Sequence, residues 1–298
     1  MKKILFPCTS SIHYQRNQLL LEKLKENFEV HIAEYSQKEM SMSEIAVDIT
    51  PKFKVALDKI KPDAVIIRAD RAELLPCTAL SVYGGYKVIQ LEAGDRSGTW
   101  DNKIRYAISA LADVHFTTNS ESQQRMLSMG YTNVYNCGSL DVEYALQVAK
   151  TAPEQTKPYV MCLYHPIPNE DATEVFKALE GFDVVGIRSN KDYGQQTYTE
   201  RYSPEEFINL LRDASCIVGN SSCLIKEAGI LGTPAVLVGE RQHNRTLTKN
   251  IIKTECDKRE VEQAIKYSIE HGNYGGDLTY YKPDCSKRIS DIITSLVG

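Results

Sequence analysis

Short apolar runs alternate with helical segments along the first half of the chain, and this alternation constrains the fold more than any other feature. Apolar side chains recur at helical spacing over 16–27, 55–60, 75–82 and 103–112. Between these segments we predict strands over 4–6, 28–32, 64–67, 87–91 and 113–116. Strands that alternate with helices are typical of a parallel sheet with helices on both faces. The sequence therefore predicts a doubly wound α/β layer.

A second α/β series follows a polar stretch. The segment 149–158 is mostly polar and carries two prolines, so we predict a linker there. After it we expect strands over 159–163, 182–187, 216–219 and 234–238, and an amphipathic helix over 286–297. The predicted fold class is α/β, with two Rossmann-like domains that face each other across a cleft, the GT-B arrangement. We place the domains at 1–150 and 151–298, and we expect the last helix to pack back on the first domain.

Charge and hydropathy exclude several classes of protein. The net charge is -4 and the pI is near 5.9, whereas a nucleic-acid binder normally carries a clustered basic face. No run approaches the roughly 18 apolar residues of a membrane span. The N-terminus carries no sustained apolar stretch that would indicate a signal peptide. We therefore expect a cytoplasmic protein that binds neither nucleic acid nor membrane.

The eight cysteines form no C-x-x-C pair. In a chain of this size they are expected to be reduced structural thiols. The sequence also has no metal-ligand cluster, no Gly-x-Gly-x-x-Gly and no Walker loop. We therefore expect neither a metal nor a nicotinamide cofactor.

Three carboxylates follow predicted strands or begin a predicted helix. Asp70 comes three residues after one strand, and Glu92 follows the next strand directly. Asp101 stands before a helix, where an N-cap is the plain alternative. Arg105 lies one turn further on the same face and can hold the Asp101 carboxylate ionised. Because ligands bind at the carboxyl ends of parallel strands, these acids are candidates for proton transfer.

The second half offers an imidazole and a serine pair. His165 follows a strand, and the proline after it fixes the backbone. Its plain alternative is a structural histidine, but an imidazole also titrates near neutrality. Ser221 and Ser222 precede a helix expected to begin near Leu224, where they are either an ordinary N-cap or part of an anion site.

Five short blocks carry a resemblance to a known family. In chain order they read RADRAE, LEAGD, GTWDNKIR, YHP and GNSSCLIKE, at 68–73, 91–95, 98–105, 164–166 and 219–227. Together they resemble the UDP-N-acetylglucosamine 2-epimerases, and within them the hydrolysing branch that makes sialic-acid-type sugars. The stretch with Arg241, Gln242 and Arg245 is similar to the Arg-Gln segment of that branch.

The resemblance implies roles for the residues that match. Four residues would be catalytic: Asp70, Glu92, Asp101 and His165. Glu227 would accept hydrogen bonds from the ribose. The other residues implied to bind the UDP-sugar are Arg71, Arg105, Ser221, Ser222, Arg241, Gln242 and Arg245. No cofactor is implied, and a homodimer is the family's default.

The resemblance also implies a reaction. A base removes the C2 proton of the sugar, and UDP leaves by anti-elimination to give a glycal. Water then adds at C1 and a proton returns to the opposite face of C2, giving N-acetylmannosamine and UDP. Three alternatives stay open: the same chemistry on a bacillosamine-type UDP-sugar, the non-hydrolysing epimerase, and a GT-B glycosyltransferase.

Some positions depart from the family pattern. The loop 7–13 lacks the family's arginine, for which Arg16 is a candidate substitute. Leu224 replaces a glycine and Leu140 replaces a proline. These departures leave the carboxylates intact and bear on the choice of sugar.

Overall fold

The computed structural model describes residues 1–8, 11–35, 42–68, 71, 73–149, 158–167, 170–188 and 198–298. The chain forms two compact units. Unit 1 contains Met1–Arg96, Trp100–Glu143 and Lys282–Gly298, and unit 2 contains Ser97–Thr99 and Tyr144–Tyr281. The main boundary thus lies at 143/144, where the sequence suggested 150/151, and the C-terminal helix belongs to unit 1.

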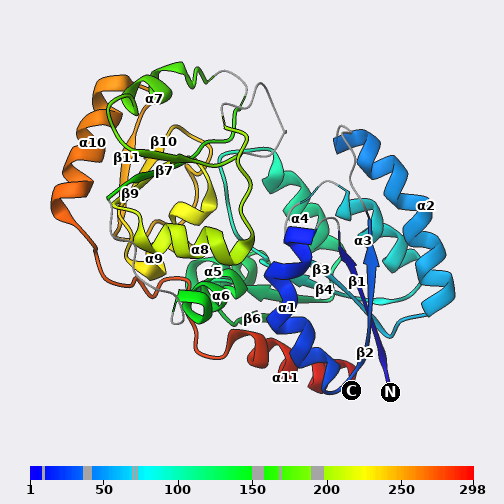
Figure 1. Ribbon diagram of the computed structural model, residues 1–298. Helices are drawn as coiled ribbons and strands as arrows, with labels where there is room; N and C mark the ends of the chain where they lie inside the picture. Colours follow the sequence, from blue (N-terminus) through cyan, green and yellow to red (C-terminus); the bar gives the residue numbers. More distant parts are fainter. Residues whose placement is uncertain are drawn as a thin grey trace. The chain divides into compact units, whose positions relative to one another are not determined.

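Unit 1 is built around a six-stranded parallel sheet in the order β2-β1-β3-β4-β5-β6 (Figure 1). Its strands are β1 (Lys3–Cys8), β2 (Glu29–Glu34), β3 (Ala64–Arg68), β4 (Lys87–Leu91), β5 (Val114–Thr117) and β6 (Val134–Asn136). Its helices are α1 (Ser11–Lys25), α2 (Met42–Ile60), α3 (Leu74–Tyr83), α4 (Asp101–Leu111), α5 (Ser120–Ser128) and α11 (Cys285–Val297), and α6 (Leu140–Ala149) begins in it.

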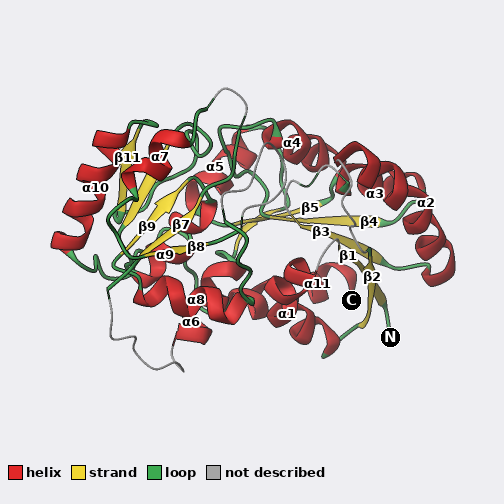
Figure 2. Cartoon of the chain, turned by 45° about the horizontal axis from the view of Figure 1, so that its top comes forward, coloured by secondary structure: helices red, strands yellow, loops and turns green. Residues whose placement is uncertain are grey.

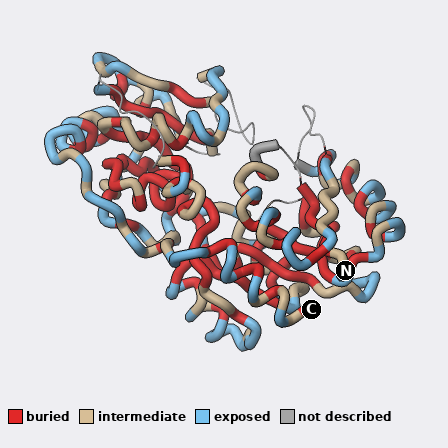
Figure 3. Tube along the Cα trace, turned by 60° about the horizontal axis from the view of Figure 1, so that its bottom comes forward, coloured by how far each residue is buried: buried red, intermediate tan, exposed pale blue. Residues whose placement is uncertain are grey.

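The two faces of this sheet are covered by different helices, as the alternation of side chains along a strand requires. Ile4 and Ile66 point to the face that packs against α1 and α11. Leu5, Val65 and Ile67 point to the opposite face, against α2, α3 and α4. Figure 3 shows the buried strands enclosed by helices whose outer faces are exposed. Burial on both faces explains why these strands are apolar throughout.

Unit 2 has a five-stranded parallel sheet in the order β11-β10-β9-β7-β8 (Figure 2). Its strands are β7 (Val160–Leu163), β8 (Val184–Gly186), β9 (Cys216–Gly219), β10 (Ala235–Val238) and β11 (Ile251–Thr254). Its helices are α7 (Thr173–Ala178), α8 (Pro204–Asp213), the 3-10 turn η1 (Ser222–Leu224), α9 (Glu227–Leu231) and α10 (Lys258–His271). One face of the sheet packs against α7 and α10.

The strand order reverses once in each sheet. In unit 1 the chain passes from β1 to β2 on one side and then continues with β3 on the other side of β1. In unit 2 the reversal lies between β7 and β9. Ligands of open α/β sheets bind outside the carboxyl ends of the strands at such a switch point. The residues that follow β1, β3, β7 and β9 are therefore the first place to look for a site.

The predicted α/β class with two parallel sheets is confirmed, and every predicted strand is present. All eight cysteines are free, as predicted, and seven of them are buried. Burial raises the pKa of Cys77 and of Cys162 to about 12, which keeps them as unreactive thiols. No helix in the described ranges is long and apolar enough to span a membrane.

Candidate functional site

An arginine lies at the switch point of unit 1. Arg68 ends β3, and the parallel register places it beside Leu91, the residue before Glu92. Its Nη2 atom donates to Glu92 Oε1 over 2.9 Å and to Asp141 Oδ1 over 2.7 Å. The side chain is only 4% exposed. Burial alone would lower the pKa of Arg68, but the charges of Asp141 and Glu92 outweigh burial and raise it.

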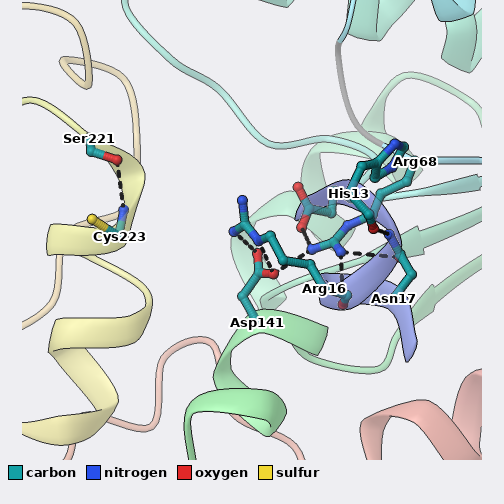
Figure 4. Close-up of polar contacts among 8 residues, drawn as sticks. His13, Arg16, Asn17, Arg68, Asp141, Ser221 and Cys223 are labelled. Carbon is teal, nitrogen blue, oxygen red and sulfur yellow. Dashed lines mark hydrogen bonds and ion pairs between the residues drawn. The ribbon is translucent and has the colours of Figure 1, made fainter. Parts of the chain in front are cut away.

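Helix α1 completes this cluster from the other side (Figure 4). Arg16 forms a bidentate ion pair with Asp141, with Nε 2.8 Å from Oδ1 and Nη2 2.6 Å from Oδ2. Asn17 Oδ1 and the Arg16 carbonyl both accept from Arg68 Nη1 at 3.1 Å. Two arginines and two carboxylates thus form one charge-balanced group, which we call the arginine–carboxylate cluster: Arg16, Arg68, Glu92 and Asp141.

A buried histidine stands beside this cluster. Burial lowers the pKa of His13 to about 3, and the charges of Arg68, Arg71 and Arg16 act in the same direction. His13 is therefore neutral at physiological pH, and the positive charge of this edge comes from arginine.

Glu92 has a backbone conformation that few glutamates adopt. Its φ is +60°, in the left-handed region, directly after the last residue of β4. Such a conformation costs about 1–3 kcal/mol and persists only where the surroundings enforce it. Its neighbours are fixed: Ala93 N donates to Phe116 O over 2.9 Å, and Arg125 donates to the Gly94 carbonyl. The fold thus holds the Glu92 carboxylate at the carboxyl edge of the sheet.

The other site residues predicted in unit 1 do not belong to the arginine–carboxylate cluster. Asp70 lies outside the described residues. Arg71 forms an ion pair with the fully buried Glu73. Asp101 is the first residue of α4, and the N-cap is Trp100, so the N-cap alternative for Asp101 is wrong. The Nη1 atom of the buried Arg105 donates to Asp95 O over 2.8 Å and to Asn102 Oδ1 over 3.0 Å, which ties α4 to the preceding loop.

At the switch point of unit 2, the side-chain amide of an asparagine pairs with the backbone of a histidine. His165 N donates to Asn220 Oδ1 over 2.7 Å, and Asn220 Nδ2 donates to His165 O over 2.8 Å. Both residues are buried. The approach of β7 and β9 is close, since a Cβ on Gly219 would lie 1.9 Å from Leu163 O, at a φ of +152°. Only glycine fits there.

The predicted Arg-Gln segment converges on the same asparagine. Arg241 Nη1 and Gln242 Nε2 donate to Asn220 O over 3.1 and 3.0 Å. Arg245 Nε in turn donates to Gln242 Oε1 over 2.9 Å. Burial, together with the charge of Arg241, lowers the pKa of His165 to about 3, so its imidazole is neutral. These contacts join His165 and the Arg-Gln segment to the block 219–227, which contains Asn220, Ser221 and Ser222.

The helix expected to begin near Leu224 begins at Glu227, after a 3-10 turn. Ser221 instead caps the 3-10 turn η1, accepting from Cys223 N over 3.5 Å (Figure 4), and Ser222 is the first residue of that turn. The α-helix that follows, α9, has five residues and is ended by Gly232 in the left-handed conformation. A helix this short adds little dipole. Glu227 lies in its first turn and is buried.

The segment before α4 belongs to unit 2 and rests on the Arg-Gln segment. Gly98 N donates to Arg241 O over 2.8 Å, and Asn244 Nδ2 donates to Ser97 O over 3.2 Å. We call Ser97–Thr99 the strap. A Cβ on Gly98 would lie 1.8 Å from Glu240 O, so the strap fits only because residue 98 is glycine.

Sequence reasoning missed three of these residues as functional candidates. Arg68 and Asn220 lie inside the blocks 68–73 and 219–227, and Asp141 directly follows Leu140, which departs from the family pattern. An arginine at the end of an otherwise apolar strand was the available signal for Arg68, because a buried charge needs a partner. Within the described ranges, no three His, Cys, Asp or Glu side chains are grouped so that they could hold a metal ion.

The fold and its two polar edges define an α/β protein of two Rossmann-like units, with candidate ligand groups at each switch point. Residues 7–294 match the UDP-N-acetylglucosamine 2-epimerase family. The chain belongs to this family, and the prediction of a UDP-sugar 2-epimerase is confirmed at that level.

Individual relatives agree with this membership. The UDP-N-acetylglucosamine 2-epimerase of Neisseria meningitidis is 30% identical, over 80% of this chain and 72% of that protein. A UDP-N,N'-diacetylbacillosamine 2-epimerase (hydrolyzing) of Legionella pneumophila is 26% identical, over 76% of this chain and 70% of that protein. The crystal structure of the Methanocaldococcus jannaschii UDP-GlcNAc 2-epimerase with UDP-GlcNAc and UDP has a TM-score of 0.81 at 16% identity, covering 98% of this chain and 99% of that one. This last similarity supports the predicted GT-B fold class.

Proposed function

We propose that the chain is a hydrolysing UDP-N-acetylglucosamine 2-epimerase. The C2 proton of the sugar is removed while the C1–O bond to UDP breaks, which leaves a glycal. Water then adds its oxygen at C1, and C2 receives a proton on the opposite face. The products are UDP and free N-acetylmannosamine.

In this proposal unit 2 holds the nucleotide. Ser221 and Ser222 supply hydroxyls to the diphosphate, and Arg241, Gln242 and Arg245 supply cationic and amide donors. Glu227 accepts from the ribose hydroxyls. Since α9 is short, the side chains of the Arg-Gln segment carry more of the anion binding than a helix terminus does.

Unit 1 supplies the proton chemistry. Glu92 and Asp101, with Asp70 from outside the described residues, share the proton transfers. Arg71 and Arg105 support the bound sugar and the catalytic carboxylates of the protein. His165, which is neutral, assists the diphosphate or the leaving oxygen as a hydrogen-bonding group without charge.

One observation carries the proposal furthest. The Asn220 carbonyl accepts from both Arg241 and Gln242, while the Asn220 amide pairs with His165. Three blocks far apart in sequence are thereby joined into one group that can hold a departing UDP. The Arg-Gln pair is also the sequence feature that favours the hydrolysing branch over the recombining one.

A modified UDP-sugar is the second candidate substrate. The Legionella relative, and a Campylobacter jejuni relative 26% identical over 72% of this chain, are both named for diacetylbacillosamine and for hydrolysis. The departures at Leu140 and Leu224 also bear on the sugar. A cytoplasmic homodimer acting in the synthesis of sialic-acid-type sugars completes the proposal.

Product analysis separates these alternatives. The protein is incubated with UDP-N-acetylglucosamine or with UDP-N,N'-diacetylbacillosamine, and nucleotides and sugars are resolved by anion-exchange chromatography. We expect UDP and a free 2-epimer in equal amounts. A UDP-linked 2-epimer without UDP release would identify a non-hydrolysing enzyme, and transfer only to an added acceptor would identify a glycosyltransferase.

A further inference from the structure

We propose that Arg68 is a positioning residue that fixes the Glu92 carboxylate for proton transfer at C2, an inference that rests on the proposed function. Arg68 reaches Glu92 from the neighbouring strand, because the β3–β4 register sets it beside Leu91. The 2.9 Å contact joins a guanidinium that is 4% exposed to a carboxylate that is 16% exposed. A charged contact this well buried is held far more firmly than a surface ion pair.

The hydrogen bonds of Arg68 fix it in one orientation. Nη1 is held by Asn17 Oδ1 and the Arg16 carbonyl, and Nη2 is shared between Glu92 and Asp141. The contacts of Arg68 with Asn17, the Arg16 carbonyl and Asp141 therefore fix the guanidinium plane independently of Glu92. A lysine carries a single ammonium and cannot make this four-way set of contacts.

The cluster also sets the charge that Glu92 experiences. Asp141 takes up part of the charge of Arg68 and is itself gripped by Arg16. The charged and titratable groups described near Glu92 include Arg16 and His13 on α1, Arg68 at the end of β3, Asp141 on α6, and Arg125 on α5, which donates to the Gly94 carbonyl. The charge of Arg71 acts on His13. The pKa of His13 is lowered, so this histidine adds no charge at neutral pH. Asp141 therefore shares Arg68 with Glu92, so that the positive charge of Arg68 does not act on Glu92 alone.

A kinetic double-mutant cycle tests the inference. Arg68→Lys should lower kcat on the order of 100-fold, the effect of a misplaced catalytic group, with KM changed by less than about twofold. In a Glu92→Gln background the same change should matter by no more than about twofold, because its effect passes through Glu92. Equal losses in both backgrounds would show a general structural role and overturn the inference.

Asp141→Asn provides a second test that does not require turnover and keeps the shape of the side chain. It removes the carboxylate charge that shares Arg68 with Glu92 and pairs with Arg16, so the positive charge near Glu92 is less well balanced. The titration midpoint of Glu92, followed by 13C NMR of its side-chain carboxyl carbon and assigned with Glu92→Gln, should move to lower pH. An unmoved midpoint would overturn the inference, even if the wild-type protein released no UDP and the proposed function failed.

Arg212 and Asp213 offer matched controls in unit 2. They form a two-atom ion pair of the same kind, with distances of 2.6 and 2.7 Å. Arg212→Lys and Asp213→Asn should leave kcat and the Glu92 midpoint unchanged. A loss in these controls equal to that of Arg68→Lys would count against a specific link between Arg68 and Glu92.

Discussion

The amide of Asn220 and the backbone of His165 bind each other in both directions, at 2.7 and 2.8 Å. The pair fixes the loop after β7 to the loop after β9 at the switch point of unit 2. The Asn220 carbonyl at the same time anchors Arg241 and Gln242. One fully buried residue thus organises the proposed UDP site.

Asn220→Ala should therefore lower both stability and UDP affinity. It removes the two hydrogen bonds between the Asn220 amide and the buried backbone of His165, at a cost of about 1–3 kcal/mol in the free energy of unfolding. Urea denaturation measures this loss, and calorimetry with UDP should show weaker binding. Asn133→Ala removes an exposed amide and should change stability by less than about 0.5 kcal/mol. Equal effects of the two variants would contradict the role given to Asn220.

Arg241 should contribute to UDP binding more strongly than any helix terminus. Arg241→Gln removes a charge-assisted donor and should weaken the Kd for UDP by about 10–100-fold, equivalent to about 1.5–3 kcal/mol. Isothermal titration calorimetry at constant ionic strength gives the value. Arg259→Gln, on the exposed face of α10, is the matched control and should leave the Kd unchanged. If the two variants bound UDP equally well, UDP would not be held at the Arg-Gln segment.

The strap should tolerate no side chain at residue 98. Gly98→Ala brings a Cβ within 1.8 Å of Glu240 O and should push the strap off the Arg-Gln segment. We expect a loss of stability of at least about 1–3 kcal/mol, as for an overpacked core, and reduced turnover. Gly130→Ala separates this clash from backbone strain, because Gly130 has a φ of +92° and nothing within 4 Å of its added Cβ. It should cost about 1 kcal/mol and spare activity. Full activity in Gly98→Ala would show that the strap has no role.

Three buried histidines should make the fold sensitive to mild acid. Burial lowers the pKa of His13 and His165 to about 3 and that of His115 to about 4. Below the ordinary histidine pKa of about 6.5, these histidines are protonated in the unfolded chain but stay neutral in the folded chain. The free energy of unfolding therefore decreases as the pH falls from 6.5 towards 4. Each histidine contributes about 1.4 kcal/mol per pH unit over this window.

Urea midpoints measured from pH 7.5 to 5 check this. His115→Gln should reduce the slope by about 1.4 kcal/mol per pH unit, because one group no longer titrates. Histidine ring protons of His13 or His165 that titrate near pH 6.5 in the folded protein would refute the account.

The sequence predicted the strands well because they are buried on both faces. A continuous apolar run such as 64–67 has few other ways to fold next to predicted helices. Helices were harder to predict. The sequence indicated only the last part of α2, because Pro51 lies inside it and proline normally ends a helix. For α8 the signal was present and overlooked: Ser203 and Glu206 form a capping box around Pro204.

The site could be predicted in part, for a similar reason. Acidic and hydroxyl residues that directly follow a strand can be predicted as site candidates from the sequence, because parallel strands end at a common edge where ligands bind. The partners that hold them come from elsewhere in the chain. Nothing local in the sequence pairs Arg68 with Asp141, 73 residues later, or Asn220 with Arg241. The helix expected near Leu224 begins only at Glu227 because residues 222–224 form the 3-10 turn η1 capped by Ser221, and Gly232 ends it after five residues.

Proton NMR of the protein with UDP-N-acetylglucosamine in D2O, without added metal or cofactor, tests the central claim most directly. We expect free UDP together with N-acetylmannosamine that carries deuterium at C2, because C2 must lose its proton and regain one from solvent. UDP release with the C2 proton retained, or no change in the substrate, would contradict it.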